Sequence, residues 1–212
     1  MSLPLGLRRP SWFKFMSFLA LFIAFTYSSF SQSNKFATKI NNFGQINENY
    51  YRGAQPYAAD YPVLKKMGIK TIIDLQKDGQ FQESSWVQDA GMQYFKIPLS
   101  STHPATAEQT QYFLKLVNDP ANWPVYVHCA GGRHRTGEMT AIYRINHDSW
   151  AADRAYVEMK QYGYYAFPNH GSLRQYVYSY YSNFQGGPKK DDKVSIPVPA
   201  ALKNPTLAIG PN

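Results

Sequence analysis

The residues best suited to chemistry are gathered in one short segment, HCAGGRHRTG, at residues 128–137. This segment holds the single cysteine of the chain, Cys129, and an arginine, Arg135, six positions later. An ionised cysteine is a strong nucleophile, and a planar guanidinium can hold two oxygens of a phosphate group at once. The segment therefore predicts a thiolate nucleophile that faces a phosphate-binding side chain.

The residues between Cys129 and Arg135 predict a loop that binds an anion. Glycines let such a loop curl between a strand and a helix until its backbone N–H groups converge on one point. These amides, the positive end of the helix dipole and the guanidinium should lower the pKa of Cys129 below the usual value of about 8.5. We expect the substrate phosphate to contact Ala130, Gly131, Gly132, Arg133, His134 and Arg135.

Two flanking residues are expected to support the nucleophile. The hydroxyl of Thr136 can donate to the sulfur of Cys129, and His128 can brace the backbone of the loop. The predicted reaction has two steps, attack by the thiolate on phosphorus and release of phosphate by water, and requires no metal or cofactor. Two other interpretations stay open: a silent phosphate-binding protein, and an inert buried cysteine in a chance strand–turn–helix.

The hydrophobic pattern around the segment indicates alternating strands and helices. Two short strands are expected within 35–56, followed by strands at 71–75, 92–99 and 124–129; helices are expected at 57–67, 83–90, 107–118, 136–147, 151–162 and 172–181. This alternation predicts an α/β fold of three layers, with a mainly parallel central sheet flanked by helices. The catalytic loop should join the last strand to a helix.

The two ends of the chain differ in composition from the middle. Residues 1–32 combine Arg8, Arg9 and Lys14 with an apolar stretch and small residues, which predicts a signal peptide or an N-terminal anchor. The protein would then be exported, periplasmic or membrane-anchored facing outward, with membrane contact only if this segment is retained. Residues 35–184 form the expected phosphatase domain, and the Pro- and Gly-rich residues 186–212 a flexible tail.

Composition narrows the possible partners. The formal charge of the 212 residues is +8, but the three basic residues near the N-terminus account for part of it. No cluster of Lys and Arg interleaved with aromatic residues stands out in the rest of the chain, so we expect no nucleic-acid partner. With one cysteine an intrachain disulfide is impossible. We expect a monomer that acts on a phosphorylated substrate.

Several longer segments resemble the atypical dual-specificity phosphatases of plants and fungi and their bacterial relatives, within the protein tyrosine phosphatase superfamily. The matching segments are YYRGAQP, LKKMGIKTIIDL, NDPANWPVYVHCAGGRHRTG, NHDSW and YYAFP, between about Tyr50 and Tyr181. The resemblance implies a phosphatase fold and hydrolysis of phosphotyrosine or other phosphomonoesters. It also implies an alternative substrate class, inositol polyphosphates or pyrophosphates, to which Arg133 and His134 would add positive potential. Arg52 and Gln55 are expected to serve as scaffold.

The sequence departs from this family at the proton donor for the leaving group. Classical members of the superfamily carry an Asp about thirty residues before the cysteine, whereas residues 97–116 contain none. His103 lies in that region and titrates near neutrality, so it is the predicted general acid. Glu108 fits the first turn of a helix better, and Asp74 is expected to support the loop from the end of a strand.

Overall fold

A computed structural model describes residues 38–185. The predictions for residues 1–32 and for the tail at 186–212 lie outside these residues. Among residues 38–185, no helix combines the length and the apolar character that crossing a bilayer would demand.

The core of the fold is a five-stranded sheet in the order β1-β2-β5-β3-β4. Its strands are β1 (Gly44–Asn47), β2 (Tyr50–Ala54), β3 (Thr71–Gln76), β4 (Gln93–Leu99) and β5 (Val125–Cys129). The β1–β2 hairpin is antiparallel, and every other pairing is parallel. The prediction of a mainly parallel sheet is confirmed. Cys129 ends the central strand, at the edge of the sheet where parallel α/β folds place their sites.

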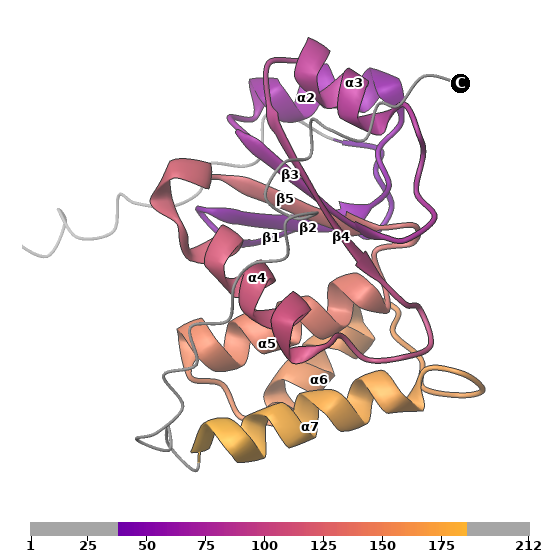
Figure 1. Cartoon of the computed structure of the whole chain (residues 1–212), viewed down its shortest axis with the longest axis vertical. Coiled ribbons are helices and arrows are strands. Elements are labelled where there is room, and N and C mark those ends of the chain that lie inside the picture. The colour runs from indigo at the N-terminus through magenta and orange to yellow at the C-terminus, as the bar shows by residue number, and fades with distance from the viewer. Residues whose placement is uncertain (1–37, 186–212) are drawn as a thin grey trace, which may run out of the picture. The chain divides into compact units, whose positions relative to one another are not determined.

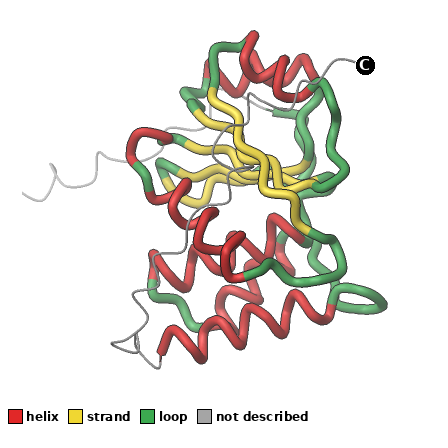
Figure 2. The backbone as a smooth tube through the Cα atoms, viewed as in Figure 1, coloured by secondary structure: helices red, strands yellow, loops and turns green. Residues whose placement is uncertain are grey.

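Helices cover both faces of the sheet (Figure 1). They are α2 (Tyr61–Lys66, preceded by a 3₁₀ turn at Ala58–Asp60), α3 (Glu83–Asp89), α4 (Ala107–Asn118, followed by a 3₁₀ turn at Pro120–Asn122), α5 (Arg135–Asp148), α6 (Ala152–Gln161) and α7 (Gly171–Gln185). Helices α2 and α3 lie on one face, and α4 and α5 lie on the other, with α6 and α7 packed beyond α5 (Figures 1 and 2). This arrangement confirms the predicted three layers.

The central strands are apolar on both faces, which explains why their sequences read as continuous hydrophobic runs. Ile72 and Tyr126 belong to the core beneath α2 and α3, whereas Ile73 and Val127 belong to the core beneath α4 and α5. All four are fully buried, and each aliphatic side chain buried in this way contributes about 1.5–3 kcal/mol. The two cores hold β5 rigidly and so fix the position of Cys129.

Helix α4 begins where its sequence predicts. Thr106 is the N-cap: its hydroxyl accepts a hydrogen bond from the N–H of Gln109, and the side chain of Gln109 accepts one from the N–H of Thr106. This reciprocal pair satisfies two backbone donors that the helix itself leaves free. The same cap fixes the end of the loop in which His103 lies.

Candidate active site

The loop between β5 and α5 curls as its glycines predict. Gly132 has a φ of 65°, in the left-handed region that favours glycine. A Cβ atom at this position would lie 2.4 Å from the carbonyl carbon of Gly53 and 2.5 Å from its oxygen. Glycine is therefore required at position 132, both for the turn and for the close approach of β2.

The β1–β2 hairpin holds this loop from the outside. Arg52 is fully buried and donates from Nη2 to the carbonyl of Gly132, while its guanidinium lies 3.9 Å from the ring centroid of Tyr162. Asn42 donates to the carbonyl of Gly131 at 2.7 Å, and the N–H of Gln55 donates to the carbonyl of Ala130 at 3.3 Å. The scaffold role predicted for Arg52 and Gln55 is confirmed. Both residues form hydrogen bonds with backbone carbonyls of the loop.

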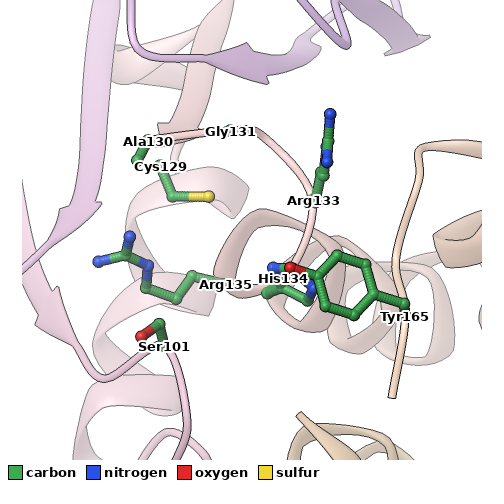
Figure 3. Close-up of a pocket in the computed structure, with 8 residues that line it drawn as sticks. All are labelled: Ser101, Cys129, Ala130, Gly131, Arg133, His134, Arg135 and Tyr165. Atoms are coloured by element: carbon green, nitrogen blue, oxygen red, sulfur yellow. The ribbon is translucent and has the colours of Figure 1, made fainter. Parts of the chain in front are cut away.

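A cavity of about 210 Å³ opens above this loop (Figure 3). Its lining consists of Ser101, Cys129, Ala130, Gly131, Arg133, His134, Arg135 and Tyr165. Most of the predicted phosphate-binding residues thus share one cavity with the cysteine. The exception is Gly132, which is buried and shapes the turn. Thr136, predicted to donate to the sulfur, is also outside the lining and is buried in the first turn of α5.

The surroundings of Cys129 favour its ionised form. Burial alone raises the pKa of this thiol, because a charge is costly away from water. The hydroxyl and N–H of Thr136, the charge of Arg135 and the N–H of Gly132 act against burial and lower the pKa below its ordinary value. The effect of Thr136 on the sulfur has the direction that the sequence predicted. A thiolate with these neighbours is equipped to attack an electrophile.

Arg135 borders the cavity and is almost fully buried. Its Nη1 lies 3.4 Å from Oδ1 of Asp78, whose side chain is 85% exposed. Figure 3 shows the guanidinium on the same side of the cavity as Cys129 and Ser101. An arginine placed in this way can bind two oxygens of a phosphate group above the sulfur.

His128 does not brace the loop backbone as the sequence suggested. Its Nε2 lies 2.7 Å from Oε1 of Glu83, the first residue of α3, and both side chains are fully buried. Successive residues of a strand point to opposite faces, so His128 faces the α2–α3 side of the sheet, away from the phosphate loop. Bracing of the loop falls to Arg52 and Asn42 instead.

Asp74, Glu83 and His128 offer ligand atoms within 4.8 Å of one another and are the group within residues 38–185 best placed to hold a metal ion. The two carboxylates, however, face different nitrogens of the imidazole: Glu83 lies beside Nε2, and Asp74 Oδ1 lies 4.0 Å from Nδ1. Charge pairing around a protonated histidine explains this arrangement better than coordination, in which all ligand atoms converge on one point.

Aromatic and histidine side chains form the rim of the cavity. The rings of His134 and His170 stack with centroids 3.7 Å apart, and Tyr165 meets His134 edge-on at 4.4 Å. Burial and the positive charges of His170, Arg133 and Arg135 lower the pKa of His134 to about 4. His134 is therefore neutral at neutral pH, which corrects the expectation that it adds positive potential. Arg133 is exposed at the rim.

The segment before α7 is tied to the loop that precedes α4. His170 donates from Nδ1 to the carbonyl of Ser101 at 2.6 Å, a bond that fixes the proton on Nδ1 because a carbonyl can only accept. Ser172 donates to the carbonyl of Thr102 at 2.7 Å. These bonds hold Ser101 at the cavity.

The remaining sequence candidates lie outside the lining of this cavity. His103 is exposed, and its Nδ1 lies 3.1 Å from the hydroxyl of Thr102. Glu108 is exposed in the first turn of α4, where its own backbone N–H and the Thr106 hydroxyl lower its pKa. Asp74 does not reach the loop: it accepts from the N–H of Gln76 at 2.8 Å and from Tyr94 at 3.0 Å.

Sequence reasoning missed Ser101, Tyr165, His170, Asp78 and Glu83 as neighbours of the site. None of them belongs to the HCAGGRHRTG segment, and each reaches the site through tertiary contacts. The segment YYAFPNH carried one signal, since Pro168 and the nearby Gly171 marked the gap between two helices.

Comparison with known proteins agrees with this geometry. Residues 25–174 match the family model described as DSP-PTPase phosphatase fused to NAD+ kinase. OCA1 of Mycosarcoma maydis is 33% identical over 108 residues, which cover 49% of this chain and 68% of that protein. The dual specificity protein phosphatase TpbA of Pseudomonas aeruginosa is 28% identical over 123 residues, 58% of this chain, so the match spans 55% of that relative's length.

Solved structures share the fold. The crystal structure of P. aeruginosa TpbA aligns with a TM-score of 0.57 at 25% identity, covering 70% of this chain and 92% of that structure. The core catalytic domain of the PP-IP phosphatase SIW14 from S. cerevisiae, in complex with citrate, aligns with a TM-score of 0.57 at 23% identity, covering 65% and 84%. The chain belongs to the DSP-PTPase phosphatase family described by the matching model.

Proposed function

We propose that this protein is a cysteine-dependent phosphatase that hydrolyses phosphomonoesters of the phosphotyrosine or dual-specificity type through a phosphocysteine intermediate. The observation that carries the proposal is the cavity in which Cys129, with a lowered thiol pKa, shares one wall with Arg135 and the curled loop. A thiolate, a guanidinium and converging amides are the groups that in-line phosphoryl transfer requires.

In the first step the thiolate of Cys129 attacks phosphorus, an S–P bond forms, and the ester P–O bond breaks. Arg135 and the amides of the loop stabilise the charge on the phosphoryl oxygens, and the leaving oxygen takes a proton. In the second step water attacks phosphorus, the S–P bond breaks, and phosphate leaves. Thr136 donates a hydrogen bond to the departing thiolate.

The donor of the leaving-group proton is proposed to be His103, as the sequence suggests. It lies in the loop between β4 and α4, exposed and close to Ser101, which lines the cavity. The proposal requires the exposed imidazole to turn toward the leaving group when substrate is bound. A general acid contributes roughly 10²–10⁴-fold to the rate when it is well placed.

The second candidate substrate class is the inositol polyphosphates and pyrophosphates. The exposed Arg133 at the rim favours it, and a yeast relative that is 24% identical over 156 residues is named inositol diphosphatase SIW14. The neutral His134 and the carboxylate of Asp78 beside Arg135 favour a less charged substrate. We therefore rank phosphotyrosine or another singly phosphorylated group first.

A substrate panel tests this proposal. The full chain should hydrolyse an aryl phosphate and a phosphotyrosine peptide faster than phytate, and Cys129→Ser should abolish all three activities. Arg133→Ala should reduce hydrolysis of phytate more than that of the peptide, because only the polyphosphate needs a further cation. Hydrolysis that survives in Cys129→Ser would refute the phosphocysteine route, and phosphate binding without turnover would indicate the silent phosphate-binding protein.

We also propose that the protein acts outside the cytoplasm as a monomer, with 35–184 as the phosphatase domain and 186–212 as a tail. Support for export comes from the basic and apolar residues of 1–32. N-terminal sequencing of protein from cell fractions tests the location: a mature chain that starts near residue 33 in the exported fraction is expected. An intact leader on cytoplasmic protein would contradict export.

A further inference from the structure

The reaction described above does not use the pair of His128 and Glu83, although the two side chains are fully buried against each other. Both side chains have no exposed surface, and only 2.7 Å separates Nε2 from Oε1. Tyr61 of α2, also fully buried, donates to the same Oε1 at 2.8 Å. Burying two ionisable groups is costly unless they are paired, so the pair must carry complementary charges.

A second carboxylate borders the same imidazole from β3. Asp74 is fully buried, and its Oδ1 lies 4.0 Å from Nδ1 of His128. Lys96 of β4 lies 3.6 Å from Oδ2 of Asp74 and balances part of its charge. The titratable and charged groups around His128 are Glu83 from α3, Tyr61 from α2, Asp74 from β3, Tyr94 and Lys96 from β4, Tyr126 and Cys129 from β5, and Arg52 from β2.

These neighbours keep a proton on His128. Burial alone lowers the pKa of the imidazole, but the charges of Glu83, Asp74 and ionised Cys129 raise it above the ordinary value. The pKa of Glu83 falls for the reciprocal reason, against the effect of its burial. His128 directly precedes the nucleophile on β5, both side chains are buried, and the attraction between the imidazolium and the ionised sulfur is one of the effects that raise the pKa of His128. Opposite charges attract strongly where water cannot screen them.

We propose that Glu83 is a positioning residue for the nucleophile: it holds His128 as a buried imidazolium, and that charge stabilises the ionised sulfur of Cys129. Because Glu83 is the first residue of α3, this helix influences the ionisation of Cys129 from the opposite face of the sheet, through His128 of β5. The inference rests on the proposed function for its biological meaning, but its physical claim concerns only the ionisation of one thiol.

Alkylation of the thiol tests the claim without any phosphatase assay. Cys129 is the only cysteine of the chain, so the rate of reaction with iodoacetamide against pH reports the ionisation of this residue alone. Glu83→Gln keeps the size of the side chain and removes its charge. We expect the midpoint of the alkylation profile to rise by about one pH unit, which corresponds to a roughly tenfold loss of thiolate well below the midpoint.

A matched variant separates this effect from a general response to replacing a buried glutamate. Glu138→Gln also replaces a fully buried glutamate, but Glu138 accepts from the N–H of Ala105 and does not contact His128. Its alkylation midpoint should stay at the wild-type value. Circular dichroism and thermal melting should show that both variants are folded.

Two further variants keep the test decisive if Glu83→Gln fails to fold. His128→Gln should raise the midpoint directly, and Glu83→Gln added to His128→Gln should cause no further rise, because the charge through which it acts is gone. An unchanged midpoint in folded Glu83→Gln or in His128→Gln would overturn the proposal, as would an equal rise in Glu138→Gln. A wild-type protein that is alkylated normally but hydrolyses no phosphate would refute the proposed function and leave this inference standing.

Discussion

At the scale of single residues, the site depends on charge placed around one sulfur atom. Thr136, Arg135 and Gly132 lower the pKa of Cys129 directly, against the effect of burial. The pKa of the rim histidine, His134, falls to about 4, so this residue contributes no charge at neutral pH. The cavity is thus lined by two basic side chains, Arg135 and, at its edge, Arg133.

Replacing Arg135 by Lys tests the importance of guanidinium shape. Lysine keeps the positive charge but cannot hold two phosphate oxygens in one plane. We expect kcat/KM for an aryl phosphate to fall by roughly 10²-fold or more, the usual cost of losing a stabilising donor from a preorganised site. Steady-state kinetics measures this change, and a loss of less than about threefold would mean that charge alone is sufficient.

Replacing His103 by Gln tests the predicted proton donor. Expulsion of a phenol with a high pKa needs a proton, whereas a fluorinated coumarin with a low pKa leaves without one. We expect His103→Gln to slow hydrolysis of phenyl phosphate roughly 10²-fold and to leave hydrolysis of the coumarin phosphate nearly unchanged. The measurement is kcat/KM on both substrates.

Asp78→Asn serves as the comparison for the His103 experiment, because Asp78 is the carboxylate beside Arg135. Equal losses on both substrates in Asp78→Asn would fit a role in holding Arg135. A loss confined to phenyl phosphate in Asp78→Asn, with His103→Gln unaffected, would transfer the donor role from His103 to Asp78.

At the scale of elements, several segments distant in sequence support the loop between β5 and α5 and the loop before α4. The β1–β2 hairpin supports the loop through Arg52, the turn before β1 supports it through Asn42, and the segment before α7 holds Ser101 through His170. Helix α5 contributes a buried acid, Glu138, whose Oε1 accepts from Ala105. This acid connects α5 to the same loop that contains His103.

Glu138 should make stability depend on pH. Burial raises its pKa from 4.5 to about 8, so the folded state keeps a proton that the unfolded chain releases. Between about pH 4.5 and pH 8 the folded state binds more protons, and this glutamate therefore reduces stability progressively as pH rises. Glu138→Gln removes the effect and should increase the free energy of unfolding at pH 7 by roughly 1–3 kcal/mol.

Urea unfolding of wild type and Glu138→Gln at pH 5 and pH 8 measures this effect. The difference in stability between the two proteins should be larger at pH 8 than at pH 5. A difference that is independent of pH, or larger at pH 5, would show that Glu138 is ionised in the folded protein at neutral pH.

At the scale of the whole molecule, most of the layered fold could be predicted from the sequence, because the hydrophobic periodicity of a strand or helix depends only on nearby residues. Helix 107–118 was predicted at its observed bounds, because Thr106 is a favourable N-cap residue and marks the start of the helix. The HCAGGRHRTG segment predicted the loop, the nucleophile and the phosphate-binding arginine for the same reason: their contacts lie within ten residues of one another.

Contacts between segments that are distant in the sequence could not be predicted. Glu83 and His128 are 45 positions apart, and nothing in either segment shows that they meet across a buried face. His128 was therefore assigned to the loop that follows it, although strand alternation turns its side chain away. The stacking of His134 on His170 was missed likewise, and with it the loss of charge at His134.

The most direct test of the account is to trap the covalent intermediate. The full-length protein is mixed with an aryl phosphate, quenched rapidly in acid and digested, and the peptides are identified by mass spectrometry. We predict one phosphoryl group on the peptide that contains Cys129, formed in a burst together with the phenol and lost in Cys129→Ser. Turnover with no phosphoryl group on Cys129, or with a phosphoryl group on another residue, would contradict the mechanism.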